Sequence, residues 1–335
     1  MKISIVRIDK MGDMILTFPI IQGLKKSNHN NKIDVVCSEQ NSKICNKFNI
    51  INKVFLFNNN FTRILKMIMK LRSENYDYIF AFSPGILSIL ISILSKSKNK
   101  SLLVLQSRYK DSFSSKFLEI VIGKFFFQHL IIVNRKLKFS QDSSIHQTKL
   151  MSELVAKSGL EIKENEEIKH VFQFKTYKYG PKKLCLIHLS SKWINRYFSE
   201  SNFINLLNSL KNPNTDIVIT TDESSKNVFS KIFKKYECID NNQFKNLKNI
   251  NNILILDKLN FENWVSIINS STHVITPECG CTHIASLSNS KLCVIYDADN
   301  LPDMIASEYA PWKKSYTKLS TNDEKLEEKL ISFSN

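Results

Sequence analysis

The chain has 335 residues, 43% of them hydrophobic, which is enough for two domains with full cores and excludes a disordered protein. The net charge is +16, and it is uneven: residues 1–165 hold 26 Lys/Arg against 12 Asp/Glu, whereas residues 166–335 hold 21 against 19. A basic excess in one half favours an anionic partner such as a membrane surface, a phosphorylated lipid or a nucleic acid, or else a solvated lysine-rich surface.

The cysteines and the apolar runs indicate the cellular compartment in which the protein is expected. Seven cysteines occur without a C-x-x-C pair, which predicts free thiols in a reducing cytosol and argues against structural zinc. The chain opens directly on a strand pattern, so we expect no signal peptide. The longest apolar run, 79–94, is interrupted by Ser83-Pro84-Gly85 and is too short for a bilayer, which favours a strand, a turn and a buried helix.

Strands and helices alternate along the first half. Apolar runs predict strands at 3–6, 33–37, 54–57, 78–82, 102–105 and 130–133, with helices between them, for example at 14–26, 62–72 and 86–94. This alternation indicates right-handed crossovers and a parallel sheet.

The first candidate site is Met11-Gly12-Asp13, which we expect in the loop after the first strand. Gly12 would allow a close backbone turn, and Asp13 would lie at the carboxyl end of the sheet, where a carboxylate can accept a proton from a sugar hydroxyl. The alternative, which spacing alone favours, is that Asp13 only caps the next helix. No G-x-G-x-x-G fingerprint of dinucleotide-binding domains occurs.

A basic, aromatic stretch from Arg108 to Phe126 follows in the first half. Phe113 and Phe117 stand at helical spacing with lysines close by, a pattern that suits core packing and, as a minority interpretation, a lipid interface. Residues 146–159 then predict an amphipathic helix that closes the first domain. The acidic segment 161–167 is the expected linker, so we place one domain at 1–165 and a second at 166–335.

The second half repeats the alternation. Strands are predicted at 184–188, 217–220, 253–256, 273–276 and 292–295, and helices at 199–210, 224–235, 261–269 and 282–288. A final helix at 323–333 is expected, with the option of packing back on the first domain. The predicted architecture is two doubly wound, Rossmann-like α/β domains that face a central cleft, with ligands at the carboxyl ends of the strands.

Two polar loops follow strands of the second half. Ser190, Ser191, Lys192 and Arg196 follow its first strand, where hydroxyl, ammonium and guanidinium groups suit phosphate oxygens. An ordinary surface loop is equally compatible with them. Glu223 lies in an acidic loop after the next strand, where it would bind a ribose or provide first-turn charge to a helix.

The segment Val274–Ala285 is the most informative in the chain. An apolar strand ends at Thr276-Pro277, a turn of Glu278-Cys279-Gly280 follows, and a helix is expected to begin near Thr282. Backbone N–H groups at such a helix start favour a diphosphate. His283, in the first helical turn, would donate to a phosphate or serve only in packing.

With these motifs assembled, the chain resembles family 9 glycosyltransferases, the lipopolysaccharide heptosyltransferases. The resemblance covers about residues 1–300, from Arg7 through Gly12-Asp13 and Tyr76-Asp77 to the second-half loops at 190–198 and 276–285. It implies a GT-B fold with the acceptor in the first domain and a nucleotide-diphosphate sugar, such as ADP-heptose, in the second. It implies inverting transfer that needs neither a metal nor another cofactor.

The resemblance also implies roles for individual residues. It makes Asp13 the general base near the acceptor hydroxyl. Lys192 and Arg196 are competing matches for a phosphate contact. The positions that the resemblance assigns to substrate binding are Gly12, Ser190, Ser191, Lys192, Arg196, Glu223, Glu278, Cys279, Gly280 and His283. The basic half would meet an anionic lipid-linked glycan at the inner face of the cytoplasmic membrane, which makes the enzyme cytoplasmic and peripheral.

One departure from the family pattern leaves a second hypothesis on function open. The family usually has Asp-Thr-Gly where this chain has Glu278-Cys279-Gly280, so the transferred sugar is expected to differ or the chain to be a non-catalytic nucleotide-sugar-binding member. Only the positive charge favours nucleic-acid binding, because the sequence contains no recognisable nucleic-acid-binding motif. We therefore expect a glycosyltransferase that builds a surface glycan and binds no nucleic acid.

Overall fold

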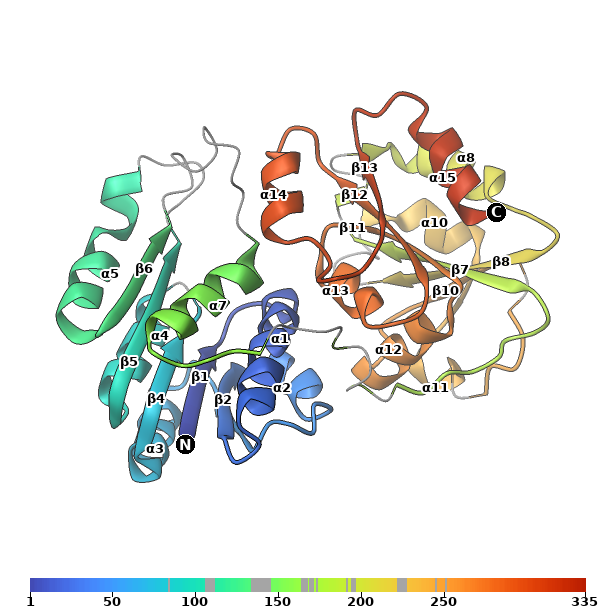
Figure 1. Cartoon of the computed structure of the whole chain (residues 1–335). Coiled ribbons are helices and arrows are strands. Elements are labelled where there is room, and N and C mark those ends of the chain that lie inside the picture. Colours follow the sequence, from blue (N-terminus) through green and yellow to red (C-terminus); the bar gives the residue numbers. More distant parts are fainter. Residues whose placement is uncertain are drawn as a thin grey trace. The chain divides into compact units, whose positions relative to one another are not determined.

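The computed structural model describes residues 1–83, 85–105, 112–133, 146–163, 168, 172, 174–190, 192–193, 197–221, 228–244, 246–250 and 252–335. These form two compact units (Figure 1): Met1–Phe172 with Ser307–Ala310, and Gln173–Ala306 with Pro311–Asn335. The change of unit at Phe172 lies seven residues beyond the expected boundary. Among the described helices, none has the length and apolar character needed to cross a membrane.

The first unit is a six-stranded parallel sheet with helices between its strands. Along the chain its elements are β1 (Lys2–Arg7), α1 (Met11–Ser27), β2 (Lys32–Ser38), α2 (Glu39–Cys45), β3 (Lys53–Phe57), α3 (Phe61–Glu74), β4 (Tyr76–Ala81), α4 (Ile86–Leu94), β5 (Ser97–Leu105), α5 (Ser112–Phe126), β6 (His129–Val133) and α7 (Gln147–Lys157). The strand order is β3-β2-β1-β4-β5-β6. Chain order therefore reverses between β1 and β4, which creates a switch point where ligands bind in open α/β sheets.

The second unit has a seven-stranded sheet of described strands, and all six of its neighbouring strand pairs are likewise parallel. Its elements are β7 (Lys183–Leu189), α8 (Glu200–Ser209), β8 (Thr215–Thr221), α10 (Ser230–Lys235), β9 (Glu237–Ile239), α11 (Asn241–Phe244), β10 (Ile253–Leu256), α12 (Phe261–Ser270), β11 (His273–Pro277), α13 (Gly280–Ser286), β12 (Lys291–Tyr296), α14 (Pro302–Glu308), β13 (Thr317–Ser320) and α15 (Leu326–Ser334). The order β13-β12-β11-β7-β8-β10-β9 places the switch point between β7 and β11.

Burial explains why the central strands form as they do. In β1, β2, β7 and β12 almost every side chain is buried, as expected of parallel strands covered on both faces. In the second unit, Trp193 and Phe203 lie in one apolar cluster with strand residues from β7, β8, β10 and β11, and Tyr197 and Phe198 pack against it.

The C-terminal helix belongs to the second unit. Leu326 and Leu330 of α15 are buried in the same apolar cluster as the strands of that unit. The residues that return to the first unit are instead Ser307–Ala310. There His146, at the start of α7, contacts the Ala310 carbonyl oxygen through Nε2 at 3.0 Å. The option that the final helix also packs back on the first domain stays a prediction.

Candidate active site

Asp13 lies at the switch point of the first sheet. Its neighbour in space is Arg7, the last residue of β1, whose guanidinium Nη2 stands 3.1 Å from Asp13 Oδ1. Asp13 is the third residue of α1, and the N-cap of this helix is Lys10, which makes no side-chain capping bond. The interpretation of Asp13 as an N-cap is therefore wrong, because its carboxylate is used for pairing with Arg7.

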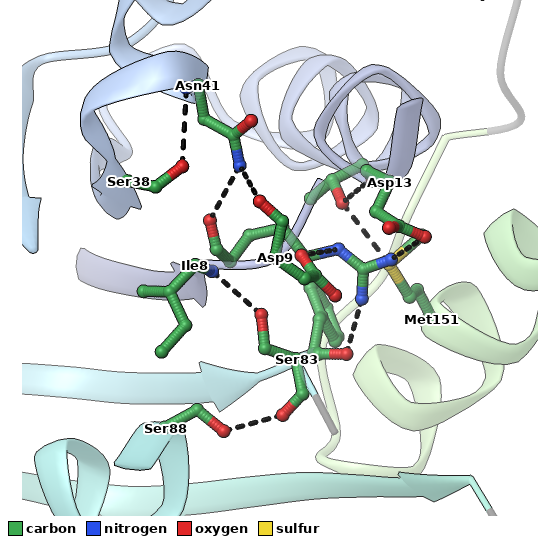
Figure 2. A network of polar contacts seen from close by, with 11 residues as sticks. Ile8, Asp9, Asp13, Ser38, Asn41, Ser83, Ser88 and Met151 are labelled. Atoms are coloured by element: carbon green, nitrogen blue, oxygen red, sulfur yellow. Dashed lines mark hydrogen bonds and ion pairs between the residues drawn. The ribbon is translucent and has the colours of Figure 1, made fainter. Parts of the chain in front are cut away.

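Arg7 connects three groups from different elements. Its side chain is 1% exposed, and besides Asp13 it pairs with Asp9 (Nε to Oδ1, 3.2 Å). It also donates through Nη1 to the carbonyl of Phe82, the residue just after β4. Figure 2 shows Asp9 and Asp13 on the two sides of this guanidinium group. A buried guanidinium needs such partners to offset its desolvation, so it fixes the orientation of both carboxylates.

Asp9 differs from Asp13 in its surroundings. Burial raises the pKa of Asp9 from 3.8 to about 6; Arg7 opposes this shift and the charge of Asp13 adds to it. One guanidinium thus serves two carboxylates, and Asp9 takes up a proton more readily than a free aspartate does. Sequence reasoning missed Asp9, although a charged residue just beyond a strand that ends in arginine was the available signal.

Hydrogen bonds hold the loop between β1 and α1 in place. Asn41 of α2 donates from Nδ2 to the carbonyl oxygens of Asp9 and Arg7, at 3.0 and 3.3 Å. The Ile8 amide donates to Ser83 Oγ at 2.7 Å, and Ser88 in turn donates to the Ser83 carbonyl (Figure 2). The loop that carries Asp9 is therefore tied to elements on both sides of it, which preorganises the site.

Gly12 does not form the turn that was expected. It is the second residue of α1 and is buried, and the change of direction occurs at residues 8–10 instead. Because its φ is not positive, the position does not need glycine for backbone conformation. Gly12 therefore adjoins Asp13 on a helix, not in a loop.

In the second unit, Lys192 and Glu278 meet at the switch point of the sheet. Lys192 follows β7 and Glu278 follows β11, two neighbouring strands in which Ile187 pairs with Ile275. Lys192 Nζ lies 3.1 Å from Glu278 Oε2 and also donates to the Glu278 carbonyl. Both side chains border a small hollow whose other lining residues are Tyr197, Tyr296, Asp297, Asn300, Pro302 and Ile305.

Ser190 provides a second polar group at the same edge. Its side chain is buried at 7% exposure, and within the part of the chain that the structure describes its Oγ has no hydrogen-bond partner. An unsatisfied buried hydroxyl carries a desolvation cost that a ligand oxygen could offset. Ser191, Arg196 and Glu223, the other expected contacts of these loops, lie outside the described residues.

The turn after β11 is built from hydrogen bonds that include a thiol. Thr276 Oγ1 lies 3.3 Å from Cys279 Sγ, and the Cys279 amide donates to Thr282 Oγ1 at 3.3 Å. Burial raises the pKa of the Cys279 thiol, and the Thr276 hydroxyl and Lys192 oppose that shift. The thiol therefore acts here as a neutral group that fixes the turn.

Helix α13 starts two residues earlier than expected, directly at Gly280. A Cβ added to Gly280 would meet no atom within 4 Å, so packing within the protein does not require glycine there. The open space above this Cα suits close approach by a ligand. His283, in the first turn of the helix, is 3% exposed.

Comparison with known proteins decides the family. The model of glycosyltransferase family 9 (heptosyltransferase) matches residues 64–332. The chain belongs to this family. It is therefore a glycosyltransferase of the heptosyltransferase type, as its sequence motifs predicted.

Solved structures agree on the GT-B fold of this glycosyltransferase. The E. coli heptosyltransferase WaaC with ADP matches with a TM-score of 0.70 at 13% identity, over 96% of this chain and 93% of that one. A family 9 glycosyl transferase from Veillonella parvula gives 0.69 at 14% identity, over 99% and 90%. The E. coli ADP-heptose lps heptosyltransferase II gives 0.66 at 11% identity, over 99% and 97%. No curated protein matches the chain in a sequence search.

The glycosyltransferase thus has a polar constellation at the switch point of each sheet. In the first unit it comprises Arg7, Asp9 and Asp13; in the second it comprises Ser190, Lys192 and Glu278, with Gly280 and His283 on the adjoining helix. The first can orient a carboxylate beside a hydroxyl nucleophile. The second offers a cation, a buried hydroxyl and an accessible glycine backbone, the groups that suit a diphosphate.

Proposed function

We propose that this glycosyltransferase moves a heptose or a related sugar from a nucleotide-diphosphate sugar to an anionic, lipid-linked glycan of the lipopolysaccharide core type. The observation that carries the proposal is the Asp13 carboxylate held through Oδ1 by buried Arg7 at the β1 switch point. Among the described residues its Oδ2 has no partner, and a fifth of the side chain is exposed. Asp13 can therefore receive a proton from an acceptor hydroxyl while Arg7 keeps it oriented.

The proposed reaction is a single displacement. The acceptor hydroxyl oxygen attacks the anomeric carbon, its proton passes to Asp13, and the bond from that carbon to the phosphate oxygen breaks. The bonding electron pair leaves with the nucleoside diphosphate. Because the hydroxyl attacks from the face opposite this leaving group, the configuration at the anomeric carbon inverts. Asp13 contributes by general base catalysis, which is worth roughly 10²–10⁴ in rate.

The leaving group needs charge stabilisation, which the second unit is proposed to supply. Lys192 provides an ammonium group two residues after Ser190, whose buried hydroxyl is a ready donor to a phosphate oxygen. Gly280 and His283 on α13, and Ser191, Arg196 and Glu223, stay proposed donor contacts. Lys192 is the stronger candidate for the diphosphate among the described residues, because its side chain reaches the β11 turn. Transfer without a bound metal remains part of the proposal.

An ADP-sugar is proposed as the donor by analogy with similar solved structures. The E. coli WaaC structures hold ADP and ADP-2-deoxy-2-fluoro heptose. Glu278-Cys279 replaces the Asp-Thr expected at the turn that contacts the sugar, and Glu278 is engaged with Lys192. We therefore propose an ADP-sugar donor whose sugar differs from, or is bound differently than, the family's usual heptose.

Product formation tests this function. The full chain is incubated with ADP-, GDP- and UDP-sugars and a delipidated core glycan acceptor, with chelator in a parallel set. Nucleoside diphosphate release and the anomeric configuration of the product are measured by chromatography and NMR. We expect transfer from one ADP-sugar with inversion. Donor binding without transfer to any acceptor would instead support the non-catalytic alternative.

A further inference from the structure

Helices α3, α4 and α5 form one layer of the first unit. They join β3 to β4, β4 to β5 and β5 to β6, and all three crossovers run in the same direction across the sheet, so right-handed connections place them on one face. α3 contacts α4, and α4 contacts α5. α1, which crosses in the opposite direction, and α7, which contacts α1, cover the other face.

The middle helix of this layer, α4, is apolar on its outer side, and its two polar residues are buried together with Ile89 and Ile91. Leu87, Leu90 and Leu94 are 44%, 41% and 44% exposed and share one side of the helix. Ser88 and Ser92 are fully buried, with their hydroxyls donating to backbone carbonyls of the chain just before them. α4 carries no charged residue. A helix that faces water normally presents polar residues outward, so leucines outside and serines inside indicate an apolar or interfacial environment.

The neighbouring helix α5 extends the apolar surface. Phe117, Leu118 and Phe125 are all more than half exposed, with Phe125 at 81%, and they recur at helical spacing along its outer side. Gly123, on the inner side, lies against Leu102 and Leu130 of the sheet. The expectation that this aromatic stripe packs in the core is therefore wrong for Phe117, and Phe113 lies where side chains are not described.

Helix α3 borders α4 on the other side. Its exposed Phe61, Leu65 and Met69 repeat every four residues, which makes one stripe along the helix. Arg72 continues that stripe, and its Nη1 donates to the Leu94 carbonyl at the end of α4, at 2.8 Å. The stripe therefore lies on the flank of α3 that faces α4, so the exposed apolar residues of the three helices adjoin one another.

Charge identifies the partner of this surface. The three helices hold six basic residues and two acidic ones. Both carboxylates are already paired, Glu74 with Lys2 and Lys53, and Glu119 with Lys116. Arg63, Lys66 and Lys70 on α3 and Lys124 on α5 are exposed on either side of the uncharged α4. An apolar centre with cations at its borders matches a bilayer with anionic headgroups.

We propose that the layer of α3, α4 and α5 is the face with which the enzyme docks on an anionic phospholipid bilayer. The leucines of α4 and the aromatic residues of α5 enter the interface, while Arg63, Lys66, Lys70 and Lys124 meet lipid phosphates. A second copy of the chain would bring two basic faces together, and a nucleic acid would leave the leucines in contact with phosphates. The proposal rests on the proposed function only for its setting, a lipid-linked acceptor.

Vesicle flotation of the full chain, without donor or acceptor, tests the docking face. The probes are phosphatidylcholine vesicles with and without 30% phosphatidylglycerol (about a third anionic lipid, chosen to resemble an anionic leaflet). The variants are Leu87→Ser/Leu90→Ser, Phe125→Ser and Lys66→Glu/Lys70→Glu. The matched controls in the second unit are Leu301→Ser, which is 40% exposed, and Lys211→Glu/Lys248→Glu.

We expect wild type to bind the anionic vesicles and to lose binding with added salt. Reversing Lys66 and Lys70 should weaken binding about twentyfold or more, since each basic residue near an anionic surface contributes about fivefold. Replacing Leu87 and Leu90 or Phe125 should weaken it about tenfold. The controls should bind as wild type does, and unchanged melting temperatures show that the variants are folded.

Three outcomes overturn the docking proposal. The first is that wild type does not bind anionic vesicles, and the second is that variants and controls bind them equally well. The third is that wild type is a dimer in analytical ultracentrifugation and the Leu87→Ser/Leu90→Ser variant is a monomer. Transfer to the delipidated acceptor is measured separately on each variant. Loss of vesicle binding with full transfer supports the docking face, whereas absent transfer with normal vesicle binding counts against the proposed function alone.

Discussion

At the scale of single residues, the first prediction concerns Asp13, whose carboxylate is oriented by a buried cation. Asp13→Asn keeps the shape of the side chain but cannot accept the proton. We expect kcat to fall about 10²-fold or more, with donor affinity unchanged, because the proposed donor contacts lie in the second unit. Turnover and donor binding by calorimetry check this, with exposed Glu39→Gln as the control. Turnover like that of wild type would exclude Asp13 as the base.

The pair of Lys192 and Glu278 makes a second prediction. Glu278 holds the ammonium group that we propose for the donor diphosphate, so the carboxylate competes with the phosphate. Glu278→Gln should therefore tighten binding of the nucleoside diphosphate a few-fold, and Lys192→Met should weaken it about tenfold. Titration calorimetry with ADP measures both. Weaker binding in Glu278→Gln would show that Glu278 contacts the donor instead of competing with it.

Gly280 separates a binding role from a structural one. A methyl group there meets no protein atom within 4 Å. Gly280→Ala should therefore leave the free energy of unfolding unchanged, or raise it by up to about 1 kcal/mol through better helix propensity. Donor affinity should fall if the backbone approaches the diphosphate. Urea unfolding and ADP binding are measured together. A destabilised variant with full ADP affinity would contradict the assignment of this glycine to the donor site.

At the scale of the elements, the loop from β1 to α1 carries a pH dependence through Asp9. Its pKa of about 6 in the folded protein exceeds the ordinary value of 3.8, so the folded state holds the proton more tightly than the unfolded state. The associated stability is fully present below pH 3.8 and is lost as pH rises to about 6. It amounts to at most about 3 kcal/mol, since a pKa unit corresponds to about 1.4 kcal/mol.

Asp9→Asn should remove this dependence of stability on pH. The free energy of unfolding of the variant, measured by urea at intervals from pH 4 to pH 7, should change less with pH than that of wild type. Asp13→Asn should move the wild-type transition to lower pH, because the charge of Asp13 helps to raise the pKa of Asp9. Identical pH profiles for wild type and Asp9→Asn would show that another group titrates in this window.

Elements differ in how well the sequence predicted them, for physical reasons. Strands in the middle of each sheet are continuous apolar runs, and all eleven predicted strands are present. β9, Glu237–Ile239, and β13, Thr317–Ser320, were missed because edge strands this short carry polar side chains and little periodicity. Helices α1 and α13 begin earlier than predicted, because Gly12 and Gly280 suggested turns but occupy the first helical residues.

The chemistry of the candidate site was less accessible to sequence than its position. The carboxyl ends of parallel strands lie at one edge of a sheet. Asp13, Lys192 and Glu278 follow predicted strands, so they could be assigned to those edges. Their partners could not, because Lys192 and Glu278 are 86 positions apart. Likewise, the exposure of Phe117 depends on which side of α5 meets the sheet, and the spacing of its aromatic residues fits either side.

At the scale of the whole molecule, the chain holds two units, each with its own parallel sheet, and each unit has apolar clusters of its own. Nearly all the net positive charge, +14 of +16, lies in the first half, and the exposed apolar helices lie in the first unit. The proposed diphosphate contacts lie in the second unit. The net charge and the proposed docking face are thus separated along the chain from the proposed donor chemistry.

This separation predicts how ligands change thermal unfolding. Two units with separate cores are expected to give two calorimetric transitions instead of one two-state step. A donor at 100 times its Kd stabilises the unit that binds it by about 2.7 kcal/mol through mass action. ADP-sugar should therefore raise the transition of the second unit, and Lys192→Met should abolish most of that shift at the same donor concentration.

Hydrogen exchange assigns each transition to its unit. Amides of β7 and β11 should gain protection with donor, since Lys192 and Glu278 follow these two strands. Amides of β5 and β6 in the first unit should change little. Anionic vesicles should do the reverse and protect α4 and α5. Donor-dependent protection confined to the first unit would contradict the proposed donor site, because a ligand stabilises first the elements that it contacts.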